Sequence, residues 1–93
     1  MKTVANFRDL VVEARSRDYH FDHILRQWYK WEEFGEVAIE VFLDKQYGPL
    51  WRIYGPDDRR GFFSVLYEGS NHESMAHAEA CAEGFYEELN GLE

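Results

Sequence analysis

The stretch Pro49–Glu68 constrains the fold more than any other part of the chain, because it has the pattern of two strands joined by a turn. Leu50–Tyr54 and Phe62–Tyr67 are rich in aromatic and β-branched residues, which suit a pleated and half-buried surface. Residues 55–61 between them contain a proline, two aspartates and two glycines, the residue types that favour turns. The sequence therefore predicts a β-hairpin at this position.

A further strand is predicted just before the hairpin. Large apolar residues occupy every second position from Val37 to Leu43, which is the side-chain period of a strand. Residues 44–49 form the expected turn, which gives a three-stranded antiparallel meander. The face expected to be buried carries Val37, Ile39, Val41, Leu43, Trp51, Ile53, Phe63 and Val65. The opposite face is expected to carry Glu40, Phe42, Arg52, Tyr54, Phe62, Ser64 and Leu66. This outer face is unusually aromatic, so we expect a helix or a partner to cover part of it.

Helical periodicity flanks the predicted sheet on both sides. Asn6 is expected to cap a first helix, whose apolar face begins at Phe7. A second helix is predicted for residues 18–30, and a single bent helix is the alternative. The residues that carry its spacing are Phe21, Ile24, Leu25 and Trp28. The last helix is expected to follow a cap at Ser70 or Asn71. Its predicted buried stripe consists of Met75, Ala78, Ala82, Phe85 and Leu89.

The predicted order α-α-β-β-β-α makes residues 1–93 a single α+β domain, with helices packed on one face of a small sheet. No apolar run approaches the length of a membrane span, and the N-terminus lacks the apolar segment of a signal peptide. The single cysteine, Cys81, cannot form an internal disulfide, which fits a reducing compartment. We therefore expect a soluble cytoplasmic protein.

Acidic residues concentrate at the end of the chain. The net charge is −8, and residues 61–93 contain seven acidic residues but no Lys or Arg. Glu79, Glu83 and Glu87 are spaced four residues apart, so they line one flank of the last helix. Such a field repels nucleic acid and membrane phosphates and attracts basic partners. Two interpretations stay open: a solvated helix face, or a negative ridge that meets a basic partner surface.

Patterns typical of catalysis or metal binding are weak in this sequence. His20 and His23 are three residues apart on an expected helix, whereas His72 and His77 are five apart, which aligns poorly on a helix. A metal site needs three or four convergent ligands. Cys81 is interpreted as a small buried hydrophobic residue rather than a nucleophile. We expect no enzyme, no cofactor and no metal; a metal-dependent enzyme that uses His20 and His23 is the remaining alternative.

The last helix, SMAHAEACAEGFYEEL, resembles that of the double-stranded RNA-binding domain, whose element order α-β-β-β-α also matches part of the predicted order. That family binds RNA with lysines at the start of this helix. The corresponding places here hold Glu73, Ser74, Met75 and His77. The resemblance therefore implies the fold but not RNA binding.

A second resemblance concerns the segment LWRIYGPDDRRGFFSVLYEG and the acidic, alanine-rich helix after it. Together with the small size and the acidity, it is similar to small proteins of phages and mobile elements, in particular anti-CRISPR proteins and antirestriction DNA mimics. This resemblance implies a stoichiometric inhibitor that docks on a nucleic-acid-binding host complex.

The sequence thus predicts a non-enzymatic protein that docks on the basic nucleic-acid-binding surface of a host defence complex and blocks DNA or RNA binding. It is expected to bind neither nucleic acid nor membrane directly. The expected acidic contacts are Glu68, Glu73, Glu79, Glu83 and Glu87. The expected apolar anchors are Trp31, Tyr54 and Phe62, since aromatic residues are enriched in binding hot spots. The alternative is an adaptor or homodimerising domain that uses the aromatic outer sheet face.

Overall fold

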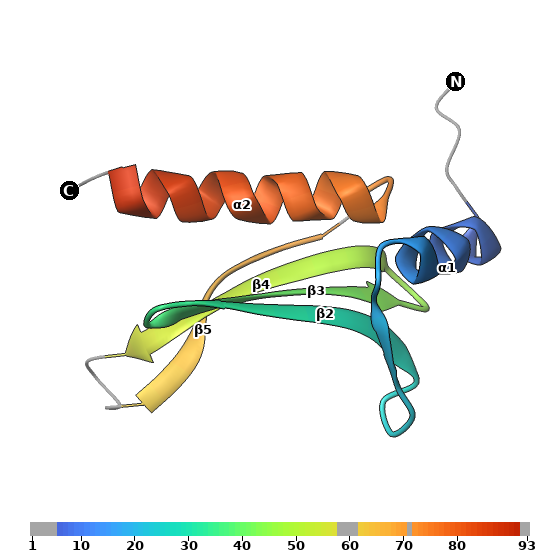
Figure 1. Cartoon of the computed structure of the whole chain (residues 1–93), viewed down its shortest axis with the longest axis horizontal. Helices are drawn as coiled ribbons and strands as arrows, with labels where there is room; N and C mark the ends of the chain where they lie inside the picture. Colours follow the sequence, from blue (N-terminus) through green and yellow to red (C-terminus); the bar gives the residue numbers. More distant parts are fainter. Residues whose placement is uncertain (1–5, 58–61, 71, 92–93) are drawn as a thin grey trace.

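The computed structural model describes residues 6–57, 62–70 and 72–91. Two helices and a five-stranded antiparallel sheet make up this part of the chain (Figure 1). The elements are α1 (Phe7–Ser16), β1 (His20–Asp22), β2 (Gln27–Phe34), β3 (Val37–Asp44), β4 (Gly48–Asp57), β5 (Phe62–Gly69) and α2 (Met75–Gly91). The strands follow one another in the sheet in chain order. The predicted α+β class is confirmed, but the sheet has five strands rather than three. The order is therefore α-β-β-β-β-β-α rather than the predicted α-α-β-β-β-α, and it does not match the α-β-β-β-α order of the double-stranded RNA-binding domain.

The helix predicted for residues 18–30 is wrong, because these residues form β1, a turn and the start of β2. Phe21 and Trp28 do not share a helix face but pair across the two strands, with ring centroids 5.2 Å apart. The helical spacing of the apolar residues between Phe21 and Trp28 is a coincidence. The segment Gln27–Phe34 is rich in aromatic residues, which favour strands, and it forms β2. Ile24 and Leu25, expected to be buried, are 92% and 67% exposed in the turn.

The end of α1 explains why helix does not continue into this region. Asp18 adopts a left-handed conformation with φ of +65°. The Tyr19 N–H donates to the Ala14 carbonyl at 3.0 Å, and the Asp18 N–H donates to the Arg15 carbonyl at 3.3 Å. This pair of bonds is the Schellman motif, which terminates a helix and reverses the chain. The reversal buries Tyr19 and directs the next residues into β1.

Both helices pack on one face of the sheet, as Figure 1 shows for the long α2. Five of the predicted inner-face residues are buried in the hydrophobic core and a sixth, Val37, packs against it. The other buried members come from α1, from α2 and from Tyr19 between α1 and β1. These core residues are Leu10, Ala14, Tyr19, Ile39, Val41, Leu43, Trp51, Ile53, Met75, Ala78 and Ala82, with Val11, Trp28, Val37, Cys81 and Tyr86 packed against them. The strand Val37–Leu43 is therefore confirmed, and so is the apolar stripe of the last helix at Met75, Ala78 and Ala82. Phe85, which was also expected to be buried in this stripe, is 42% exposed. The side chains of Phe62, Phe63 and Leu89 lie outside the description.

A register shift between β4 and β5 overturns the placement of Val65. Ile53 pairs with Tyr67, whereas the next residue, Tyr54, pairs with Val65, so β5 carries one extra residue at this point. A β-bulge of this kind moves side chains to the opposite face. Tyr67 therefore lies on the helix side, where its ring contacts Phe85, and Val65 is 43% exposed on the other side.

The second face of the sheet is not covered by either described helix (Figure 1). Phe42 lies on this face but is buried, because the Arg52 guanidinium stacks over its ring at 4.8 Å from the centroid. No helix in the described part of the chain has both the length and the apolar character needed to cross a membrane.

The start of α2 also differs from the prediction. A cap at Ser70 is wrong, since the helix begins only at Met75, and Asn71 lies outside the described residues. Ser74 takes the capping role, because its Oγ accepts the His77 N–H at 3.0 Å.

Candidate functional site

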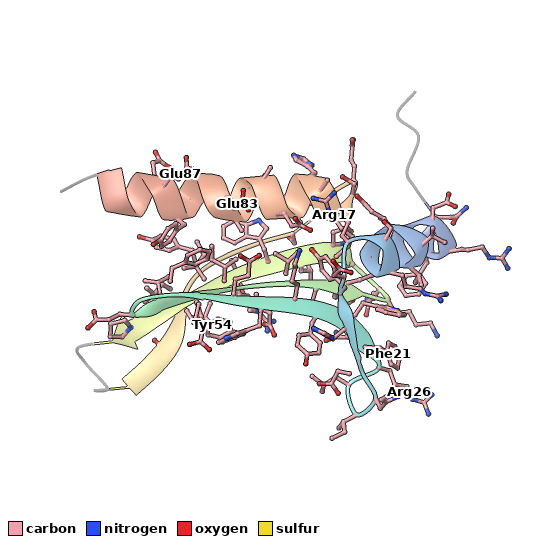
Figure 2. The ribbon with its side chains drawn as sticks, viewed as in Figure 1. Arg17, Phe21, Arg26, Tyr54, Glu83 and Glu87 are labelled. Atoms are coloured by element: carbon pink, nitrogen blue, oxygen red, sulfur yellow. The ribbon has the colours of Figure 1, made fainter. Side chains whose placement is uncertain are left out.

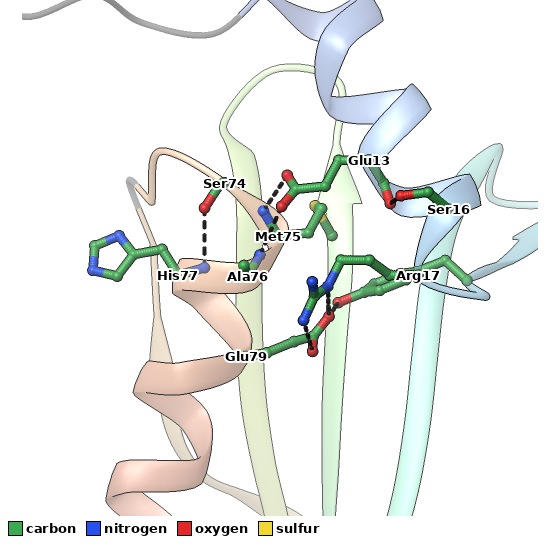
Figure 3. Close-up of polar contacts among 9 residues, drawn as sticks. Glu13, Ser16, Arg17, Ser74, Met75, Ala76, His77 and Glu79 are labelled. Atoms are coloured by element: carbon green, nitrogen blue, oxygen red, sulfur yellow. Dashed lines mark hydrogen bonds and ion pairs between the residues drawn. The ribbon is translucent and has the colours of Figure 1, made fainter.

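Helix α1 caps helix α2 through a carboxylate. Glu13 accepts the backbone N–H groups of Met75 and Ala76 at 2.8 and 3.1 Å (Figure 3). These donors belong to the first turn of α2 and would otherwise lack an intrahelical partner. A negative side chain at a helix N-terminus also interacts favourably with the helix dipole. The contact therefore fixes the position of α2 over the sheet.

A second contact between the two ends of the chain engages Glu79. Arg17 forms a two-pronged ion pair with it, at 2.9 Å from Nε to Oε2 and 3.0 Å from Nη2 to Oε1 (Figure 3). The Tyr19 hydroxyl donates to the same Oε2 at 2.7 Å. Burial alone would raise the pKa of Glu79, but the hydrogen bonds from Arg17 and Tyr19 outweigh it, so the pKa lies below its ordinary value. Burial and the bond to Glu79 raise the pKa of Tyr19.

The predicted acidic ridge is therefore shortened at one end. The Glu79 side chain is only 15% exposed and is neutralised by Arg17, so it is not free to meet a partner. Glu83 and Glu87 are exposed on α2, and within the described residues neither has an ion-pair partner (Figure 2). Two of the three predicted carboxylates thus remain available.

A groove runs between α2 and the strands β2 and β3, with a volume of about 270 Å³. We call it the acidic groove; it is lined by Glu32, Phe34, Ile39, Glu83, Tyr86 and Glu87. The rings of Phe34 and Tyr86 lie 4.8 Å apart and form an apolar surface beside the carboxylates. Glu32 was not predicted as a site residue, because residues 18–30 were expected to form a helix and β2 was missed. Alternation along β2 could have placed Glu32 and Phe34 on one face.

The remaining predicted partner contacts lie elsewhere. Glu68 is exposed on the uncovered face, 3.5 Å from Arg52, and therefore on the side of the sheet opposite α2. Glu73 is exposed just before α2 and has an interaction of its own. The structure therefore does not bring the five predicted glutamates together into one patch.

Trp31 and Tyr54 do lie together on the uncovered face, with ring centroids 5.2 Å apart. The Trp31 indole donates to Glu33, and the Tyr54 hydroxyl donates to Glu40 at 2.9 Å. A pocket of about 430 Å³ opens on the same side of the sheet. Its lining includes Phe42, Tyr47, Leu50, Arg52 and Glu68.

The turn between β1 and β2 projects away from the sheet (Figures 1 and 2). The Asp22 carboxylate accepts the N–H groups of Ile24 and Leu25 at 2.9 and 3.0 Å, which orders the turn. The structure thus exposes two aliphatic side chains on a locally fixed backbone. We call residues 23–26 the hairpin tip, and sequence reasoning missed it because the same residues fit a helical stripe.

The histidines of the remaining enzyme alternative do not form a metal site with each other. His20 packs against Tyr29 across β1 and β2, with ring centroids 6.0 Å apart. His23 packs edge-on against Phe21 at 5.1 Å. Among the described residues, the one group of three convergent metal-binding side chains does not include either of them.

Comparison with known proteins found no matching family model, no similar curated protein and no similar solved structure.

Proposed function

We propose that this protein is a non-enzymatic binding protein that docks on a basic, nucleic-acid-binding surface of a host defence complex and blocks it. The class of inhibitor is the anti-CRISPR type of phage protein. The acidic groove is the observation that carries the proposal. It joins carboxylates from β2 and α2 to a pair of aromatic rings. Within the described part of the chain, none of these carboxylates forms an ion pair with a Lys or Arg side chain.

The chemistry of the groove suits an arginine or lysine side chain. Glu83 and Glu87 lie one turn apart on α2, where like charges repel by a few tenths of a kcal/mol. A guanidinium between them would relieve this repulsion and donate two parallel hydrogen bonds to a carboxylate. The rings of Phe34 and Tyr86 offer a surface for its apolar stem and for a cation–π contact.

The overall charge supports the same partner. A net charge of −8 speeds association with a basic surface and disfavours direct contact with phosphates. A basic groove that binds nucleic acid presents arginine and lysine side chains at its surface. A protein that occupies those side chains competes with the nucleic acid.

An arginine-rich peptide provides a direct probe of the groove. We expect the triple variant Glu32→Gln, Glu83→Gln and Glu87→Gln to weaken binding of this peptide about tenfold. Each exposed ion pair contributes roughly 0.5 kcal/mol, and every 1.4 kcal/mol is a factor of ten. Fluorescence anisotropy at low and high salt measures the change.

A matched control separates the groove from net charge. The triple variant Asp9→Asn, Asp18→Asn and Glu33→Gln changes the net charge by the same amount but leaves the groove intact. It should retain peptide binding close to that of the wild type. Equal losses in the two triple variants would show that only the overall charge matters and would reject the groove as the binding site.

The uncovered sheet face favours a second candidate, an adaptor or homodimerising domain. Trp31 and Tyr54 lie together on this face, and the exposed Val65 pairs with Tyr54 across β4 and β5. The hairpin tip exposes two further apolar side chains, Ile24 and Leu25. Light scattering tests this function, because a dimer that Trp31→Glu dissociates would support it. A wild-type protein that stays monomeric at high concentration would contradict homodimerisation.

A further inference from the structure

The fold brings two histidines and the single cysteine together around the start of α2. We propose that His72, His77 and Cys81 bind one Zn²⁺ ion. The ligand atoms of the three side chains all lie within 4.8 Å of one another. This site is separate from the acidic groove and does not depend on the proposed function.

The position of the helix start makes the cluster possible. His77 and Cys81 are four residues apart on α2, so they share one face of the helix. The five-residue spacing argued against a shared site for His72 and His77 only if both lay on one helix. His72 precedes α2, so that argument does not apply. The two imidazole rings meet edge to face, with centroids 5.0 Å apart.

The distances require only small adjustments to hold an ion. Zinc bonds of about 2.0 Å to nitrogen and about 2.3 Å to sulfur separate neighbouring ligand atoms by roughly 3.3 to 3.7 Å. The three side chains therefore need to close by about an ångström through rotation about their own bonds. His77 is exposed, so an ion can reach the site from solvent. Cys81 is half-buried against the core, so its thiolate is partly shielded from solvent.

The donor set selects the class of metal. Two imidazole nitrogens and a thiolate suit Zn²⁺ and related borderline ions, whereas Mg²⁺ and Ca²⁺ prefer oxygen ligands. Binding replaces the Cys81 thiol proton, which is released to solvent as the sulfur–zinc bond forms. Three protein ligands leave the fourth position of a tetrahedral ion for water.

Trp51 gives the site an intrinsic reporter. Its indole Nε1 donates to His72 Nε2 at 2.8 Å. A neutral imidazole has one lone pair, so His72 cannot ligate an ion and accept this hydrogen bond at the same time. Zinc binding should therefore break the Trp51–His72 bond and change the fluorescence of Trp51.

The test uses the untagged full chain, because a polyhistidine tag would bind the same metals. Titration with Zn²⁺ against a chromophoric chelator should show one ion per chain. Co²⁺ should give an absorption band from thiolate-to-cobalt charge transfer, and Zn²⁺ should abolish it. In the wild type, Zn²⁺ should also slow the reaction of Cys81 with a thiol reagent, a readout that needs no variant.

The variants assign the ligands. Cys81→Ser and His77→Ala should each weaken Zn²⁺ binding more than about tenfold, since losses of 10- to 100-fold accompany even the removal of supporting residues around a metal. The double variant His20→Ala and His23→Ala is the control. It removes two histidines outside the cluster, the same number as the cluster contains, and should bind Zn²⁺ like the wild type. A Co²⁺ complex without the sulfur band, an unprotected Cys81, or equal loss in the double variant would overturn the proposal.

Discussion

At the scale of single residues, Gly69 shows how one position can depend on a side chain across the sheet. Gly69 on β5 pairs with Trp51 on β4. A Cβ added at Gly69 would lie 2.4 Å from Trp51 Nε1 and 2.5 Å from Cε2. The buried indole is held by the core and by its bond to His72, so it cannot easily move away. Glycine is therefore required here by space rather than by backbone conformation.

We expect Gly69→Ala to lower the free energy of unfolding by about 1–3 kcal/mol, the usual cost of overpacking. Urea denaturation measures it. Gly84→Ala is the matched control, because a Cβ there meets nothing within 4 Å on the exposed side of α2. That change should instead stabilise the protein by up to about 1 kcal/mol through helix propensity. The prediction fails if both alanines have the same sign of effect.

Asp18 carries the opposite kind of constraint, since its φ of +65° is a conformation that glycine adopts more easily. We expect Asp18→Gly to raise the free energy of unfolding by roughly 0.5–1 kcal/mol, because it relieves strain at the end of α1. Thermal denaturation checks this, with Asp18→Ala as the comparison. An alanine variant as stable as the glycine variant would show that the left-handed backbone carries no cost.

At the scale of elements, the two helices are joined by charged contacts although they lie at opposite ends of the chain. Glu13 of α1 caps α2, and the Arg17 guanidinium and Tyr19 hydroxyl both reach Glu79. The same pairing removes Glu79 from the acidic surface. A carboxylate that the sequence suggested for a partner thus stabilises the packing of α1 on α2.

Glu79 makes stability depend on pH in a definite direction. Its folded-state pKa is lowered, so the unfolded chain binds the proton more readily. The contribution is present above the ordinary pKa of about 4.5 and is lost as the pH falls through the lower folded value. Glu79→Gln should therefore flatten the loss of stability below about pH 4.5, as measured by urea denaturation across pH.

The same variant should cost roughly 1–2 kcal/mol at neutral pH. The carboxylate that accepts from Arg17 and Tyr19 becomes a neutral amide, whose one oxygen accepts fewer and weaker hydrogen bonds. Glu83→Gln is the control and should keep both the neutral-pH stability and the acid slope of the wild type. An unchanged acid slope in Glu79→Gln would mean that other carboxylates dominate acid unfolding.

At the scale of the whole molecule, the helices divide the surface into two sides. Glu83 and Glu87 lie on α2, whereas Tyr54, Phe21 and Arg26 lie on the far side of the sheet or on the projecting hairpin (Figure 2). The acidic groove and the uncovered face are therefore separate surfaces. Separate surfaces that share no contacts should respond to substitution independently.

We expect Trp31→Glu to leave arginine-peptide binding unchanged and the groove triple variant to leave the oligomeric state unchanged. The combined variant should show the sum of the two effects. Anisotropy and light scattering on the same preparations measure this. Loss of peptide binding in Trp31→Glu would show that the partner contacts both sides or that the two surfaces are coupled.

Much of the fold could be read from local pattern. The alternation of Val37–Leu43, the hairpin that follows, the Asn6 cap and the buried stripe through Met75, Ala78 and Ala82 all agree with the structure. These signals depend on side-chain period and on short-range hydrogen bonds, which the sequence contains directly. The helix predicted for residues 18–30 failed because four apolar residues fit a helical spacing while the chain reversal at Asp18 left no local signature.

The sequence by itself determined the α+β class, most of the core and the excess of negative charge near the end of the chain, because periodicity and composition are local properties. Only the tertiary structure decided which charges remain free. Arg17 and Glu79 are 62 residues apart, and Glu32 meets Glu83 and Glu87 only after β2 lies beside α2. Such pairings depend on strand register and helix docking, which arise from the cooperative packing of the whole chain.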